Sequence, residues 1–294
     1  MARFANNVKT ALLMGGLMGL FLAVGSMYGQ NGMIFALAFG GLANIIAWFF
    51  SDKIAIMAMQ GQEVGPDEGG IHGELYRMVD ELRQNAGMPM PRVYVCPHQA
   101  PNAFATGRSP KKAAVAVTEG ALEILSLEEL RGVMAHELAH VKNRDTLTSA
   151  IAATIAGVLA YIAQWGMLFG GGRDRETNPI VMFVTFIVAA LGAAVIKSMI
   201  SRSREFVADH DGAVIAGTPR GLMGALLKLD AYSQRIPLQN PNPAQNSMFI
   251  VEPLTGGSSI LNLFASHPPT EKRVEALRKL EAEMRGVAPQ YGLV

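Results

Sequence analysis

Residues 126–145 read SLEELRGVMAHELAHVKNRD, and their pattern predicts a single helix. Ser126 followed by Glu129 three positions later is a capping box, in which two side chains satisfy free amide groups at a helix start. The residues that surround the two histidines of the stretch are mostly uncharged, as expected of a helix that packs beneath a site. The helix is therefore predicted to run through His140 toward Asp145.

The two histidines of this stretch are four residues apart. On a helix His136 and His140 lie one turn apart on one face, so both imidazoles can reach the same metal ion. Glu137 is offset by about 100° around the axis, which suits a general base acting on water rather than a ligand. The pattern is typical of a catalytic zinc site, with one Zn²⁺ per chain and one coordination position left open. Such a site activates water and polarises a carbonyl, so the predicted chemistry is peptide-bond hydrolysis.

Outside this helix the sequence is unusually apolar, and the apolar residues occur in blocks. Hydrophobic residues make up 50% of the 294 residues, and charged residues make up 17%, against about 25% in typical soluble chains. A bilayer-spanning helix needs about 20 apolar residues. Four spans are predicted, near 10–28, 33–50, 147–170 and 179–199, with a turn at 29–32. For the last two spans, a hairpin buried in a protein core is the alternative.

The basic residues near the span ends predict the orientation. Because Lys and Arg are enriched in cytoplasmic segments, both termini and the polar segments 51–146 and 201–294 are expected in the cytoplasm, where the two segments form one protease domain. The parts 1–50 and 147–200 are then transmembrane hairpins. The fold class is thus an α-helical membrane protein with about four transmembrane helices and an α+β cytoplasmic domain. Strand candidates for this domain lie at 92–96, 102–107 and 113–117.

A catalytic zinc needs a third protein ligand, and the spacing leaves two candidates. Asn143 and Thr146 stand where an extended motif would have Gly and a third His, so a carboxylate further along the chain is expected. Glu176 is excluded because the topology places it across the membrane. Glu205 and Asp209 follow, one helical turn apart. One of them is expected to bind the metal while the other accepts a hydrogen bond from a ligating imidazole.

Four motifs together closely resemble the HtpX heat-shock protease family, over nearly the whole chain. They are the His136–His140 motif, Glu205 with Asp209, residues 101–107 (PNAFATG) and residues 266–270 (SHPPT). The resemblance implies a membrane-integrated zinc endopeptidase of the bacterial inner membrane, related to the CAAX prenyl proteases. It implies a role in stress-linked quality control of misfolded or damaged membrane proteins, and it implies that Glu205 is the third ligand, with Asp209 supporting an imidazole.

Other roles are less sharply defined by the sequence. The resemblance implies that Asn102, Ala103 and Phe104 form an edge strand that pairs with substrate backbone, against the alternative of an ordinary buried strand. Arg204 or His210 is a candidate to stabilise the oxyanion, against the alternative of a surface salt bridge.

Composition limits the partners. The net charge of +1 gives no support for a nucleic-acid partner. The apolar blocks predict contact with the lipid bilayer, and the resemblance implies protein substrates, among them membrane proteins. The single Cys96 suits a reducing compartment. Two further hypotheses are a metal-binding membrane scaffold or chaperone without proteolysis, and a protease whose motif lies inside the bilayer. Glu137 argues against the first, and the charged residues that flank the motif argue against the second.

Overall fold

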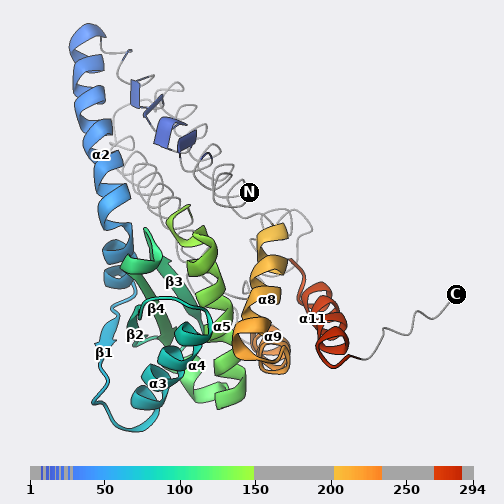
Figure 1. The fold of residues 1–294 in the computed structure, drawn as a ribbon. Helices are drawn as coiled ribbons and strands as arrows, with labels where there is room; N and C mark the ends of the chain where they lie inside the picture. Colours follow the sequence, from blue (N-terminus) through green and yellow to red (C-terminus); the bar gives the residue numbers. More distant parts are fainter. Residues whose placement is uncertain are drawn as a thin grey trace, which may run out of the picture.

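Figure 1 shows the computed structural model, which describes residues 29–148, 202–233 and 268–286 and scattered positions between 8 and 26. The predicted span 179–199, nearly all of the span 147–170 and about half of 10–28 therefore lie outside the described residues. The described elements, in chain order, are α2 (Gly29–Ala58), β1 (Gln62–Val64), α3 (Gly70–Asn85), β2 (Arg92–Cys96), β3 (Ala103–Gly107), the 3-10 helix η1 (Pro110–Lys112), β4 (Ala113–Thr118), α4 (Glu119–Ile124), α5 (Leu127–Asn143), α8 (Arg202–Ala216), α9 (Arg220–Ser233) and α11 (Thr270–Met284).

The four strands form one sheet in the order β1-β2-β4-β3. β2 and β4 run parallel, whereas β1 and β3 are antiparallel to their neighbours. β3 is thus an edge strand, and it lies beside α5 (Figure 1). Strands are present at all three predicted places. β1 and α4 were not predicted, because three and six residues are too few to show a periodic pattern.

The two faces of the sheet pack against different helices. One face meets α3 and α5 in the main core, to which β2 contributes Val93 and Val95. The opposite face carries Tyr94, Cys96 and Phe104 and packs against the last turns of α2. Burial raises the pKa of the Cys96 thiol to about 11, so this cysteine is an inert core residue. α2 is consequently anchored to the sheet by its C-terminal end.

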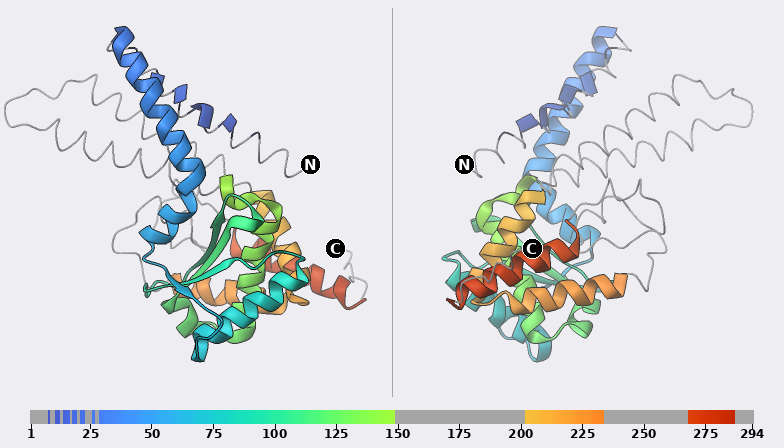
Figure 2. Two further views of the ribbon diagram at one scale, coloured as in Figure 1. Left: turned by 60° about the vertical axis from the view of Figure 1, so that its left-hand side comes forward. Right: turned by 90° about the vertical axis from the view of Figure 1, so that its right-hand side faces the viewer.

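α8 and α9 pack on α5, and α11 packs on α8 and α9 (Figure 2). A glycine makes the closest approach possible. A Cβ atom at Gly212 of α8 would lie 2.8 Å from the Cα of His136 on α5, closer than real side chains come. Gly212 therefore lets α8 lie directly against the part of α5 that carries the histidine motif.

α2 contains the predicted span 33–50, but its limits differ from the prediction. Its first 22 residues, Gly29–Phe50, are long and apolar enough to cross a membrane, and no other helix in the described part of the chain meets that test. The turn predicted at 29–32 is wrong: these residues are helical, with Gly29 at φ 73° at the start. The helix also continues to Ala58, because its last residues gain contacts with the sheet.

α5 has the capping box that the sequence predicts. Ser126 accepts a hydrogen bond from the amide of Glu129, and the Glu129 carboxylate accepts one from the amide of Ser126. Arg144 adopts a left-handed conformation and ends the helix after Asn143. The described part that ends at residue 148 and the part that begins at residue 202 lie close together: Arg204 is 3.9 Å from Asp145.

Candidate metal centre

Three side chains from two helices meet between α5 and α8. The Nε2 atoms of His136 and His140 face each other at 3.1 Å. Glu205 of α8 places its carboxylate oxygens 3.7 Å from His136 Nε2 and 3.6 Å from His140 Nε2. These three residues offer ligand atoms that all lie within 4.8 Å of one another. Packing of α8 on α5 therefore brings Glu205 to two histidines that are far from it in the sequence.

The spacing of these atoms fits a tetrahedral metal ion. Zinc–nitrogen bonds of about 2.0–2.1 Å place neighbouring tetrahedral donors about 3.4 Å apart. The observed separations of 3.1, 3.6 and 3.7 Å lie around that value. Two nitrogens and one carboxylate are also the donor types of a catalytic zinc site with an open position.

The charges around the three side chains also fit a divalent cation. The buried carboxylates are those of Glu137, Asp145, Glu205 and Asp209. The guanidinium groups beside them belong to Arg204 and Arg273. Among the described residues the acids exceed the arginines by two charges, which a divalent cation bound to two neutral imidazoles would balance. Because uncompensated buried charge is costly, this surplus favours bound metal.

A carboxylate and an arginine support His136. Its Nδ1 lies 3.0 Å from Asp209 Oδ1, a contact at hydrogen-bond distance that falls short of regular hydrogen-bond geometry. Arg273 of α11, only 1% exposed, donates to both oxygens of Asp209, at 2.8 and 2.6 Å. Burial alone would raise the pKa of Asp209, but attraction to Arg273 outweighs it and holds the pKa at about 2. Asp209 is thus a fixed anion behind the imidazole.

A different carboxylate supports His140. Its Nδ1 lies 3.2 Å from Asp145 Oδ2. Burial alone would lower the pKa of His140, but attraction to Glu205 and then the hydrogen bond with Asp145 raise it to about 9. The surroundings of this imidazole thus favour positive charge, as expected where a cation binds. Each histidine therefore has its own carboxylate behind it, an arrangement that orients metal-binding imidazoles.

Glu137 lies on α5 between the two histidines and is 6% exposed. Its charge acts on His140 and on Arg273, and in both cases it raises the pKa of the partner. It is therefore close to the cluster while its helical offset keeps it out of the three ligand positions. This is the placement that the spacing of the motif predicts.

The two oxyanion candidates lie in different surroundings. Arg204 is mostly buried beside Asp145, and its Nη1 atom has no hydrogen-bond partner. Burial lowers the pKa of Arg204. His210 has a side chain that is 58% exposed, and its partner is Asp211. The structure thus brings Arg204 to the centre and turns His210 toward solvent.

The predicted edge segment lies on β3. Asn102 and Thr118 pair through the amide of Thr118 and the carbonyl of Asn102. Because backbone groups alternate in an antiparallel pair, those of Phe104 also face β4, whereas those of Ala103 face away from the sheet. The side chain of Phe104 is buried against α2. In the side chain of Asn102, neither the amide nitrogen nor the amide oxygen has a hydrogen-bond partner. Only Ala103 of the three presents its backbone to a further strand.

Two residues of the centre were missed in the sequence. Asp145 appeared only as a charge near the end of a helix, although each histidine of a metal site usually has a supporting carboxylate, carbonyl or water of its own. Arg273 appeared as one of many charges on an amphipathic helix. The usable signal was its position, since it lies four and seven residues before Leu277 and Leu280 and shares their buried stripe.

Comparisons with known proteins give relatives over nearly the whole chain. A model of "Peptidase family M48" matches residues 71–281, which include both histidines and Glu205. A "Protease HtpX homolog" from Desulfatibacillum aliphaticivorans is 48% identical over 98% of this chain and 91% of its own length. Those from Nostoc punctiforme and Pyrococcus furiosus are 48% and 46% identical, over 95% and 94% of this chain and 98% and 96% of their own lengths.

A solved structure shares the fold. The crystal structure of S. mikatae Ste24p matches 94% of this chain with a TM-score of 0.53 at 18% sequence identity. The present chain covers 66% of that chain. The described helices and the small sheet are therefore arranged as in a larger protein of quite different sequence.

Proposed function

Because the chain belongs to peptidase family M48, we propose that it is a zinc endopeptidase of the bacterial inner membrane whose substrates are misfolded or damaged membrane proteins. That it is a membrane metallopeptidase follows from the family. The identity of the metal, the substrate class and the residue roles belong to the proposal. The observation that carries it is the meeting of His136, His140 and Glu205 within 4.8 Å, with Glu137 beside them.

The chain's own residues divide the work of hydrolysis. His136, His140 and Glu205 would hold Zn²⁺, which when bound acts as a Lewis acid and lowers the pKa of water to about 7. Glu137 takes a proton from the attacking water and passes it to the leaving amine, as a general base and then a general acid.

Arg204 is the proposed donor to the oxyanion that forms from the scissile carbonyl. Its buried Nη1 has no hydrogen-bond partner, so it can donate to an oxygen that gains negative charge. Of the two sequence candidates it is the better placed, because the side chain of His210 is largely exposed. Asp209 and Asp145 orient the two imidazoles.

The peptide substrate is proposed to add beside β3. Ala103 offers an outward N–H and C=O for a further strand. The buried side-chain amide of Asn102 has no hydrogen-bond partner. This is costly unless another group supplies a hydrogen bond. A bound peptide would be such a group. Phe104 then has a structural role, because it fixes β3 to α2.

The membrane arrangement is proposed to be that of two hairpins, 1–50 and 147–200, with one cytoplasmic domain made of 51–146 and 201–294. Thr146 donates a hydrogen bond at 2.8 Å to the carbonyl of Gly107, at the end of the sheet beside α2. The predicted third span thus starts at the end of the domain where the apolar part of α2 stops. Fusions of a topology reporter at 60 and 290 are expected to read cytoplasmic, and one at 174 periplasmic. A cytoplasmic signal at 174 would contradict the second hairpin.

Metal removal tests the proposed activity. The detergent-purified full chain is expected to contain one zinc per chain and to cleave casein. A chelator should abolish cleavage, and stoichiometric Zn²⁺ should restore it in the wild type but not in Glu205→Ala. Glu176→Ala is the matched control, which should bind zinc normally. Zinc loss in Glu176→Ala with retention in Glu205→Ala would overturn the ligand assignment.

A further inference from the structure

Basic side chains gather at one end of the sheet. Arg92 opens β2, and it pairs with Ala114 near the start of the parallel strand β4. The connection from β3 to β4 lies at this same end. It carries three more cations, Arg108, Lys111 and Lys112, of which the two lysines are exposed.

This end of the sheet adjoins the end of the apolar helix. The guanidinium group of Arg108 lies 4.8 Å from the ring centroid of Phe49. Arg92 donates a hydrogen bond at 3.1 Å to Asp52, three residues further along α2. The basic residues therefore lie at the level where α2 changes from apolar to charged sequence.

The length of α2 relates this level to the bilayer. The 22 residues Gly29–Phe50 extend about 33 Å as a helix, close to the hydrocarbon thickness of about 30 Å. Three exposed aromatic residues, Trp48, Phe49 and Phe50, end the stretch; Trp48 is of a type enriched at the membrane interface, and the two Phe rings suit the adjoining hydrocarbon. Lys53 follows, with its Nζ 5.6 Å from the ring centroid of Phe50. Residues just beyond Phe50 then lie in the headgroup layer.

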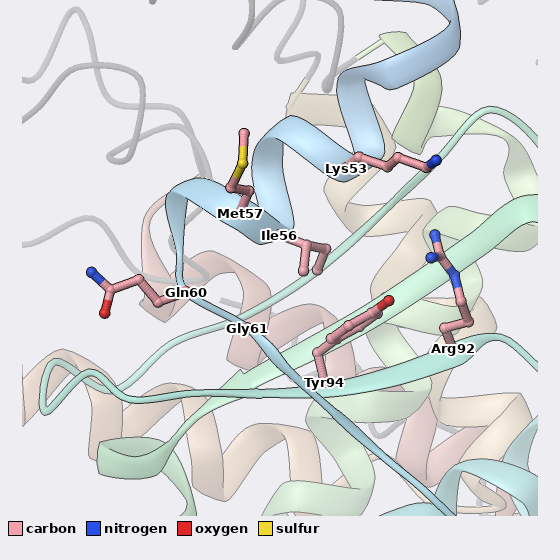
Figure 3. Close-up of a pocket in the computed structure, with 7 residues that line it drawn as sticks. All are labelled: Lys53, Ile56, Met57, Gln60, Gly61, Arg92 and Tyr94. Carbon is pink, nitrogen blue, oxygen red and sulfur yellow. The ribbon is translucent and has the colours of Figure 1, made fainter.

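A pocket opens at this level between α2 and the sheet (Figure 3). Its volume is about 450 Å³. The charged ends of Lys53 and Arg92 lie at one end of it, and Gln60 lies at the other. Tyr94 and Ile56 supply an aromatic and an aliphatic surface between them. The pocket thus combines two cations with apolar walls.

We call Lys53, Arg92, Arg108, Lys111 and Lys112 the basic rim. Among the described residues, two carboxylates contact the rim and its pocket: Asp52 accepts from Arg92, and Glu63 accepts from the hydroxyl of Tyr94 at 3.1 Å. The number of basic side chains in the rim therefore exceeds the number of these carboxylates by three.

We propose that the basic rim binds anionic phospholipid headgroups, with a headgroup phosphate between Lys53 and Arg92. The proposal rests on the proposed insertion of α2 into a bilayer. Anionic surfaces attract basic residues that lie within a Debye length of the membrane. The neighbouring aromatic rings favour a lipid over a free phosphate ion, because they sit at the hydrocarbon boundary. Binding would fix the height of the metal centre above the membrane.

Lipid retention by the full chain tests this inference. The protein in an uncharged detergent is mixed with phosphatidylglycerol or phosphatidylcholine, and bound lipid is counted by native mass spectrometry. A third arm adds inorganic phosphate. The variants are Lys53→Gln and the exposed pair Lys111→Gln with Lys112→Gln. The matched control, Arg77→Gln with Arg278→Gln, removes two charges from α3 and α11.

The wild type and the control are expected to retain phosphatidylglycerol over phosphatidylcholine. Each removed rim charge should weaken that preference about fivefold. Equal retention of the two lipids by the wild type, or an unchanged preference in both rim variants, would overturn the inference. Full displacement of phosphatidylglycerol by millimolar phosphate would show a free-anion site instead. Zinc content and casein cleavage, measured in the same samples, report separately on the proposed peptidase.

Discussion

Arg273 of α11 donates two hydrogen bonds to Asp209 of α8, from Nε at 2.8 Å to Oδ2 and from Nη2 at 2.6 Å to Oδ1. Both side chains are buried, and Asp209 in turn lies 3.0 Å from His136. Nη1 of Arg273 also lies 4.0 Å from Glu205. A helix near the C-terminus thus reaches the metal centre through one guanidinium group.

Arg273→Met is expected to weaken zinc binding 10- to 100-fold, as loss of a group behind a metal ligand does. It should also destabilise the fold by about 3–5 kcal/mol, because Asp209 is left as an uncompensated buried charge. The double variant Arg273→Met with Asp209→Leu removes that charge and should regain stability without regaining zinc affinity. Thermal unfolding and a competitive zinc titration separate the two effects. Restored zinc affinity in the double variant would contradict the positioning role.

Gly212→Ala places a methyl group 2.8 Å from the Cα of His136. α8 must then move away from α5, which carries Glu205 away from the histidines. The expected result is a cost of about 1–3 kcal/mol in stability and a weaker zinc affinity. Val214→Ala, at an exposed position of the same helix, is the control and should bind zinc as the wild type does. Normal zinc binding by Gly212→Ala would show that the close approach of the helices does not set the site.

Asp145→Asn tests the support of His140, because a neutral amide cannot hold the imidazole as a carboxylate does. Zinc affinity is expected to fall 10- to 100-fold, as measured by competition with a chelating dye. Asp211→Asn changes a carboxylate that pairs with Asn143 and His210 instead. It should leave the affinity unchanged. Equal affinities in the two variants would remove Asp145 from the centre.

Glu129 gives the contact between α5 and α9 a pH dependence. Burial alone would raise the pKa of Glu129, but hydrogen bonds from Lys228 and Ser126 outweigh it, so its pKa lies below the usual value. A lowered folded pKa gives stability that is present above the unfolded pKa of about 4.3 and is lost as the pH falls through the folded pKa.

Glu129→Gln keeps the capping pattern but removes the charge, so it should cost about 0.2–1 kcal/mol at pH 7. The gap to the wild type should begin to narrow as the pH falls below about 4.3 and close once it has fallen through the folded pKa. Unfolding curves at pH 7 and pH 3.5 measure this difference. A gap of the same size at both pH values would show that the ion pair with Lys228 contributes nothing.

Local patterns in the sequence predicted much of this architecture. The four-residue spacing of His136 and His140 and the capping box at Ser126 depend only on neighbouring residues, and α5 has both. Spacing alone could not choose between Glu205 and Asp209, because one turn of helix separates them. The choice depends on how α8 lies against α5, which packing decides.

Long-range features escaped the sequence for the same reason. Arg273 is 64 residues from Asp209, and no local pattern connects them. The end of the span was placed at residue 50 because the apolar composition stops there, whereas the helix continues where Ala55 and Ile56 pack on the sheet. The pairing of Asp145 with His140 depends on the turn of the chain at Arg144. Arg144 has a left-handed conformation, which residue propensities did not predict.

The central claim is that Glu137 moves protons while His136, His140 and Glu205 hold the metal. It is tested most directly by Glu137→Gln in the detergent-purified full chain, with zinc content and casein cleavage measured on the same sample. The expected result is one zinc per chain and a cleavage rate lowered about 10²- to 10⁴-fold. Cleavage at the wild-type rate would contradict the account. So would a wild type that binds zinc and cleaves nothing, which would make the chain a metal-binding scaffold.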